Sequence, residues 1–246
     1  MNDIPQDGIR VAALVAPFPT DRQNAQVPVI LEIAGRDLIA ASRNDVATTE
    51  IFVYAFDEDG LVRDQLFQRV AVDLNKVGDK LKESGLKYYG TLSLPGGRYA
   101  IKTLVRVVET QSRGFVRSDV VVPRDGDVAI SQPLFFEDEG KWILIKGRST
   151  NAAYPFVVNG EPFIPSAAVK RGEPRRFAIF VQNATPDEMT LETNPHAKML
   201  TQLQSTTGSK LIFQLDPAAA NAAMLNVTMK KKGSSDERTS SMPFVP

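Results

Sequence analysis

The side chains that most often perform catalysis or bind metals are scarce in this chain. Its 246 residues include one histidine, His196, and no cysteine. A serine nucleophile would have to use that histidine as its base, and the chain has no Gly-x-Ser-x-Gly turn to present such a serine. One histidine without cysteine also cannot supply the usual ligands of zinc. The sequence therefore predicts a protein that is not an enzyme, with no catalytic residues, no metal site and no cofactor.

Carboxylates could still do chemistry, because calcium needs only oxygen ligands. Asp57, Glu58 and Asp59 are consecutive, whereas a calcium loop places its acidic residues at alternating positions. We therefore interpret them as the charged tip of a hairpin, and Asp125 and Asp127 are equally weak candidates. A pair of carboxylates for glycoside hydrolysis has no sequence signature of its own, so a sandwich-fold hydrolase remains the second alternative.

Aromatic side chains are the candidates for contact with a ligand or a partner. Tyr88 and Tyr89 are adjacent, so strand alternation sends them to opposite faces and predicts that one of them faces solvent. Together with Trp142 and Tyr154, they form the predicted interaction surface. If Tyr88, Tyr89 and Trp142 form a planar row of exposed rings on one sheet, the chain would be a carbohydrate-binding module, which is the first alternative.

The elements that position these residues are predicted to be strands. Apolar residues alternate with polar ones along most of the chain, and turn residues recur between the runs, as in sandwiches and barrels. One short helix is expected at 75–85, from Asn75 to Gly85. A Pro-Gly-Gly turn precedes Tyr99, so we expect this residue to be a tyrosine corner that bonds back to the nearby backbone.

The fold class that follows is all-β, with two tandem immunoglobulin-like or fibronectin III-like sandwiches and the short helix in the first. Between residues 123 and 140, prolines, glycines and acids interrupt the strand pattern. We place the boundary there, with one domain over 1–139 and the other over 140–246. Lys102, Arg106 and Arg117 are expected at strand ends, where their charges would limit unwanted edge pairing.

Charge and hydropathy restrict the partners. Basic and acidic residues number 29 each, so the basic face that a nucleic acid requires is not expected. No run approaches the roughly 20 apolar residues of a transmembrane helix. No signal peptide is recognisable at the start of the sequence as given, so a cytoplasmic location stays open beside an exported one.

The segment from Tyr154 to Asn183 resembles a known family. It contains Tyr-Pro-Phe-Val-Val-Asn-Gly-Glu-Pro-Phe-Ile-Pro, then Arg171-Gly-Glu-Pro174 and a strand that ends in Gln-Asn. This pattern is similar to the β-sandwich region that follows the von Willebrand factor A-type domain in bacterial VWFA-related proteins. The run that ends in Pro17-Phe18-Pro19 and the Leu94 to Val107 strand resemble that region too. The Asp-x-Ser-x-Ser motif of the A-type domain is missing, so metal-dependent adhesion does not carry over.

The resemblance implies an exported protein, in the periplasm or at the cell surface. We therefore expect a non-catalytic sandwich module that acts as a scaffold or as a subunit binding other proteins within a larger complex. A glycan is the alternative partner.

Overall fold

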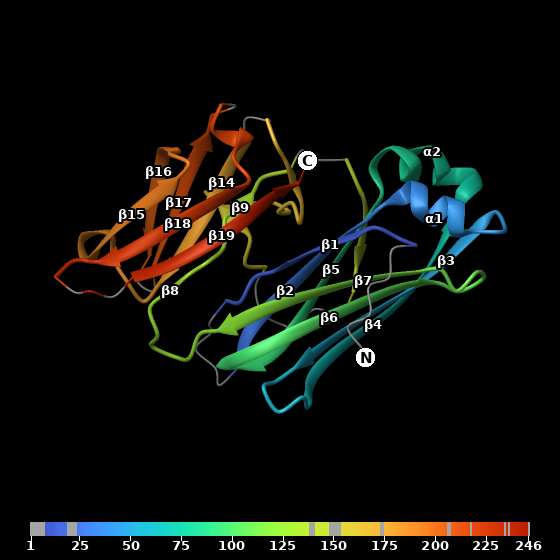
Figure 1. Ribbon diagram of the computed structural model, residues 1–246, viewed down its shortest axis with the longest axis horizontal. Coiled ribbons are helices and arrows are strands. Elements are labelled where there is room, and N and C mark those ends of the chain that lie inside the picture. Colours follow the sequence, from blue (N-terminus) through green and yellow to red (C-terminus); the bar gives the residue numbers. More distant parts are fainter. Residues whose placement is uncertain are drawn as a thin grey trace. The chain divides into compact units, whose positions relative to one another are not determined.

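The computed structural model describes residues 8–18, 24–137, 141–147, 154–172, 175–205, 208–216, 218–233, 235 and 237–245. Strands make up 62% of the structure and helices 10%, which confirms the all-β prediction. The chain forms two compact units, each described separately below (Figure 1). Unit 1 comprises Met1–Val122 and Asp138–Ala153, and unit 2 comprises Pro123–Glu137 and Tyr154–Pro246.

Unit 1 is a sandwich of two four-stranded sheets. The inner sheet has the order β1-β2-β5-β10, with bounds Val11–Val15, Asn24–Ile33, Leu86–Pro95 and Ile143–Lys146. The outer sheet has the order β4-β3-β6-β7, with bounds Val62–Asp73, Val46–Phe56, Gly97–Val107 and Arg113–Val122.

Strand alternation builds the core between these sheets. In β6, every second residue from Tyr99 to Val107 is buried, whereas Lys102 and Leu104 between them are only partly buried. The same period in β3 buries Ile51 and Val53. A period of two thus divides each strand of the outer sheet into a core face and an outer face.

Tyr99 occupies the corner between β5 and β6. Its hydroxyl donates to the carbonyl oxygen of Pro95 at 3.0 Å, the backward bond that the sequence predicted. The side chain is 6% exposed, and burial raises the pKa of its hydroxyl.

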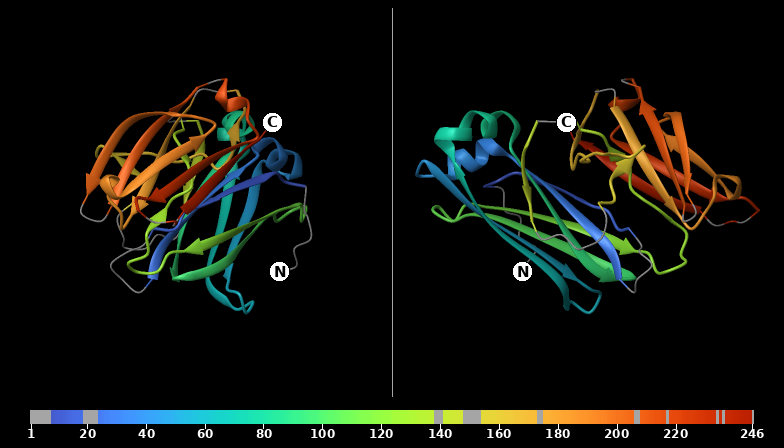
Figure 2. Two further views of the ribbon diagram at one scale, coloured as in Figure 1. Left: turned by 60° about the vertical axis from the view of Figure 1, so that its left-hand side comes forward. Right: turned by 180° about the vertical axis from the view of Figure 1, so that it is seen from behind.

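Two α-helices, rather than the single expected helix, lie at one end of unit 1, as both views of Figure 2 show. Helix α2 (Leu74–Ser84) is the predicted one, but its N-cap is Asp73, which accepts a hydrogen bond from the Asn75 backbone. Gly85 ends the helix at a φ of 91°, which glycine adopts without strain. The prediction missed α1 (Gly35–Ala41), because Gly35-Arg36-Asp37 is typical of a turn.

Unit 2 is a second sandwich. One sheet has the order β13-β19-β18-β15, with bounds Val169–Lys170, Glu237–Val245, Met224–Lys231 and Met189–Asn194. The other has the order β16-β17-β14-β8, with bounds Lys198–Ser205, Gly208–Leu215, Arg175–Gln182 and Ala129–Ile130. Strand β9 (Leu134–Phe135) also pairs with β14. Two short 3₁₀ helices, Pro186–Glu188 and Ala219–Asn221, connect strands.

In unit 2, an Asn-Gly pair forms the turn of a small hairpin. This pair belongs to the segment that resembles VWFA-related proteins. Strands β11 (Val157–Val158) and β12 (Glu161–Pro162) pair across Asn159 and Gly160, whose φ angles are 54° and 83°. Positive φ at both central residues is the geometry that makes Asn-Gly the preferred two-residue hairpin turn.

The chain crosses between the units differently from the single boundary expected at residues 139 and 140. Strands β8 and β9 precede that boundary yet pair with β14 in unit 2, and β10 follows it yet pairs with β5 in unit 1. Residues 138–140 lie outside the described part of the chain. A single division at this boundary would therefore remove β8 and β9 from the second sandwich and β10 from the first.

Candidate functional site

An apolar row crosses all four strands of the outer sheet of unit 1. Phe67 of β4 lies opposite Phe52 of β3, Phe52 lies opposite Leu104 of β6, and Leu104 lies opposite Phe115 of β7. These four residues, which we call the aromatic row, alternate with buried core residues along their strands. Their side chains therefore occupy the outer face of the sheet.

The aromatic row is accessible to solvent. Phe67 is 57% exposed, and Phe52, Leu104 and Phe115 are each partly buried among their neighbours on the sheet. The rings of Phe52 and Phe67 lie 5.0 Å apart, within the range of favourable aromatic pairs. A contiguous apolar surface on a soluble domain commonly marks an interaction site, whereas isolated exposed apolar residues do not.

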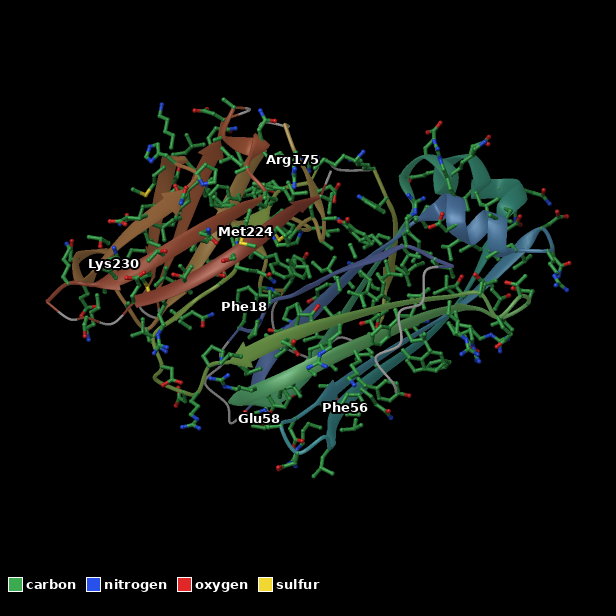
Figure 3. All side chains as sticks on the ribbon, in the orientation of Figure 1. Phe18, Phe56, Glu58, Arg175, Met224 and Lys230 are labelled. Atoms are coloured by element: carbon green, nitrogen blue, oxygen red, sulfur yellow. The ribbon has the colours of Figure 1, made fainter. Side chains whose placement is uncertain are left out.

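The apolar surface continues along β3. Tyr54 and Phe56 follow Phe52 on the same face, and their rings lie 6.2 Å apart. The Lys102 ammonium lies 5.1 Å from the centre of the Phe56 ring, a cation–π distance. Figure 3 labels Phe56 near the end of β3, close to Glu58 in the β3–β4 turn.

Two rows that carry positive charge border the aromatic row, one on each side. The first basic row consists of Arg69, Glu50, Arg106 and Arg113, one from each strand in register. The second basic row, on the opposite side, consists of Gln65, Tyr54, Lys102 and Arg117. The first row carries three arginines against one glutamate, whereas Asp119, two residues beyond Arg117 on the same face, offsets part of the charge of the second row.

Ion pairs neutralise part of this charge. Arg106 donates from Nε and Nη2 to Glu50 Oε2, and its guanidinium lies 5.7 Å from the Phe52 ring centre. Arg117 pairs with Asp119 at 2.9 Å. Arg69 and Arg113 are exposed and form no ion pair with any residue that the structure describes. These two arginines are therefore available to an acidic partner.

Lys102 and Arg106 do not have the edge-protecting role that the sequence suggested for them. Both lie in β6, which pairs with β3 on one side and β7 on the other. Arg117 lies in β7 and projects from the outer face. Lys102 and Arg106 therefore line a sheet face and do not guard an edge, whereas Arg117 lies in an edge strand.

The predicted interaction surface is not on this face. Tyr88 is 0% exposed and Tyr89 is 7% exposed, because both faces of β5 are covered. Thr91 donates a hydrogen bond to the Tyr89 hydroxyl at 3.2 Å, and burial raises the pKa of that hydroxyl. Alternation places the two tyrosines on opposite faces, but the expectation that one would be exposed is wrong.

Trp142 and Tyr154 are partly buried and already make internal contacts. The Trp142 ring lies 5.1 Å from the ammonium of Lys87, which in turn pairs with Glu32 at 3.0 Å. Lys87 is 1% exposed and Glu32 8%, so this ion pair is buried. The Tyr154 hydroxyl donates to the carbonyl of Phe163 at 2.7 Å. The four predicted residues therefore do not form a planar row.

The acidic candidates form a turn. Asp57 Oδ1 accepts hydrogen bonds from the backbone of Asp59 and Leu61, and its Oδ2 accepts one from Arg63 at 2.5 Å. These hydrogen bonds lower the pKa of Asp57, and the bond from the Leu61 backbone is the largest cause.

His196 is exposed and lies between β15 and β16. Within the described ranges, no group of three or more histidine, aspartate or glutamate side chains could hold a metal ion.

A pocket of about 230 Å³ in unit 2 is the other candidate site, and its lining includes Asp127, Glu188, Lys231 and Arg238 over Met189. Thr185 donates to Glu188 from its backbone and its hydroxyl, which lowers the pKa of that glutamate. Asp127 accepts from the Arg124 backbone at 3.0 Å. The pocket is smaller than a typical ligand site, and both of its acids are held by neighbouring residues.

One signal for the aromatic row was present in the sequence. Phe52, Tyr54 and Phe56 are spaced by two, and Ile51, Val53 and Ala55 alternate with them, so β3 is apolar on both faces. An antiparallel strand usually has one polar face, and a strand without one has a second surface to cover. The contributions of Phe67, Leu104 and Phe115 could not be recognised before the register of the four strands was known.

Comparisons with known proteins leave the family open. In the part of the chain that the structure describes, no helix has the length and apolar character needed to span a membrane. No protein-family model matches this chain, and no curated protein matches its sequence significantly.

Proposed function

We propose that this chain is a non-catalytic β-sandwich module that binds another protein through the aromatic row of unit 1. The observation that supports this is the position of Phe67, Phe52, Leu104 and Phe115 in register on the outer face of the sheet. Burying such a surface against a partner would stabilise a complex by the hydrophobic effect.

The chemistry of the surface favours a protein partner. Aromatic residues and arginine are enriched at protein interfaces, and a polar rim commonly surrounds the apolar centre. Here phenylalanines lie at the centre, and Arg69, Arg106 and Arg113 border them. The setting that we propose is a larger assembly, exported or at the cell surface, which the resemblance to VWFA-related proteins supports.

A glycan is the second candidate, and it is favoured by one observation. Sugar rings stack on flat aromatic surfaces, and the aromatic row lies on one sheet face. Three of its members are phenylalanines, which offer a ring face but no hydrogen bond to a sugar hydroxyl. This makes the glycan the weaker candidate, and the experiment below separates the two.

The test replaces Phe67 with a photo-crosslinking phenylalanine analogue in cells of the source organism. We expect a covalent adduct with one other protein, and we expect the adduct to disappear when Leu104→Lys is added. The matched control carries the crosslinker at Val121, which is 64% exposed on the same face of the sheet. Val121 lies six residues beyond Phe115 along β7, outside the aromatic row. After identification by mass spectrometry, the captured protein is purified and its binding to the chain is measured directly.

The proposal fails if position 67 captures nothing that position 121 does not capture. It also fails if soluble glucans or mannans retard the wild-type chain in native gels and do not retard the Phe67→Ser variant, because the surface then binds sugar.

A further inference from the structure

We infer that the protein bound by the aromatic row is acidic along one side of its contact surface only. Its carboxylates face Arg69 and Arg113, and this acidic side fixes how the partner is oriented on the sheet. The inference rests on the proposed function and adds the charge and the orientation of the partner. It is drawn from the unequal availability of cations on the two borders of the row.

The two end residues of the first basic row are available to a partner. Arg69 and Arg113 are exposed, and neither forms an ion pair with another side chain that the structure describes. Arg106, which lies between them, is held by Glu50 through its Nε and Nη2 atoms. Each available arginine lies two residues, or about 7 Å, from an end member of the aromatic row along its own strand. Acidic groups that border an apolar surface on this side would therefore meet two open cations.

The second basic row differs, because both of its cations already have partners. The Arg117 guanidinium donates to Asp119 at 2.9 Å, and the Asp119 side chain is 71% exposed on the same face. The Lys102 ammonium lies 5.1 Å from the centre of the Phe56 ring. The other two members of this row are uncharged. A partner therefore meets an exposed carboxylate on this side, which would repel acidic groups.

The spacing of the two open arginines sets what the partner must carry. Arg69 and Arg113 lie on the two outermost strands of the sheet, three strand steps or about 14 Å apart. The pair of Arg106 and Glu50 lies between them, so each open arginine requires a carboxylate of its own. Charges at the rim of an interface chiefly set the rate and the register of binding. The aromatic row thus supplies affinity, and the two arginines supply orientation.

Other occupants fit this face less well. Nucleic acids gain affinity when many of their phosphates are neutralised, whereas the described borders of the row offer two unpaired arginines and an exposed aspartate. A second copy of the chain would bring the same face, on whose two basic rows the basic side chains outnumber the acidic ones. Two such faces would repel each other. An acidic protein is therefore the occupant that the charges favour.

The experiment combines the full chain with the purified protein captured at position 67. A water-soluble carbodiimide then joins amines to carboxylates, and it does so only where the two groups are in contact. Arg69→Lys and Arg113→Lys each keep the positive charge and supply an amine beside the row. Gln65→Lys is the matched control, because Gln65 is exposed in the same strand on the opposite side of Phe67. Mass spectrometry identifies which residues are joined.

We expect the lysines introduced at positions 69 and 113 to be joined to aspartates or glutamates of the partner, and the lysine introduced at position 65 not to be joined. The double variant Arg69→Glu with Arg113→Glu should bind the partner about tenfold more weakly than wild type. Added salt should reduce this difference, because it screens charges at the rim. Gln65→Glu should bind as tightly as wild type. Urea unfolding of each variant verifies that it is folded.

The inference is overturned if neither position 69 nor position 113 is joined to the partner, if position 65 is joined equally well, or if the double charge reversal leaves the affinity unchanged. It is also overturned if a single-stranded oligothymidylate binds the chain more tightly than the captured protein does, because the arginines then serve phosphates. If capture at position 67 persists while these results are missing, only the inference about charge fails. If the capture itself is missing, the proposed function fails with it.

Discussion

The hydroxyl of Tyr99 shows how one atom can stabilise a corner of the fold. It donates to Pro95 across the turn between β5 and β6, and its side chain is almost fully buried. We expect Tyr99→Phe to lower the free energy of unfolding by about 1 kcal/mol, because the Pro95 carbonyl loses its donor. Urea denaturation measures the change. Tyr54→Phe, which removes a hydroxyl that has no hydrogen bond to any described residue, should leave stability unchanged; an equal loss in both variants would contradict the prediction.

The ion pair of Arg10 and Asp37 predicts a dependence of stability on pH. Hydrogen bonds from the Arg10 side chain are the largest cause that lowers the pKa of Asp37. A carboxylate whose pKa is lower in the folded state contributes stability above its unfolded value of about 3.9, and this contribution is lost as the pH falls through the folded value.

We therefore expect Asp37→Asn to be less stable than wild type at about pH 7, and the difference to shrink towards about pH 2.5. Urea midpoints at the two pH values measure it. Glu58→Gln, an exposed change in the β3–β4 turn, serves as the control. A difference between Asp37→Asn and wild type that stays constant with pH would show that the charge of Asp37 is not involved.

Among the elements, the two helices of unit 1 depend on one close approach. A Cβ added at Gly35 in α1 would lie 1.6 Å from the carbonyl oxygen of Leu81 in α2. We expect Gly35→Ala to destabilise the protein by at least about 2 kcal/mol, because backbone on both sides would have to move. Gly78→Ala in α2 is the matched control: its nearest neighbour is the Leu74 Cβ at 3.7 Å, so alanine should be neutral or stabilise the helix by up to about 1 kcal/mol. Thermal unfolding of both variants tests this, and similar shifts would contradict it.

The elements also show how far the sequence could be interpreted. Alternation identified the core face of β6, and the Pro-Gly-Gly turn identified the corner at Tyr99, because both are local features of the sequence. Helix α1 was missed since its first residues form a turn-like sequence and it is only seven residues long. Tyr88 and Tyr89 were expected to differ in exposure, but what covers the two faces of β5 is decided by residues distant in sequence. The aromatic row needed the register of four strands, which no local pattern encodes.

For the whole molecule, the interleaved path of the chain predicts where a core mutation acts. Phe135 precedes the segment that returns to unit 1, yet its ring packs 5.1 Å from Phe177 and 5.9 Å from Phe244 in unit 2. We expect Phe135→Ala to destabilise unit 2 by about 3–5 kcal/mol through the cavity that it leaves. Hydrogen exchange should then accelerate in β14 and β17 and remain unchanged in β2 and β5. Ile145→Ala in β10 should do the reverse, and protection lost in the opposite unit would contradict the pairing of these strands.

The central claim is that the aromatic row is a binding surface and contributes little to folding. The most direct test is the dissociation constant of the purified protein captured at position 67, measured for wild type and for Phe115→Ser. We predict at least about tenfold weaker binding for this variant, as for an interface hot spot, with a urea midpoint close to that of wild type. Equal affinity for the two proteins would contradict the claim.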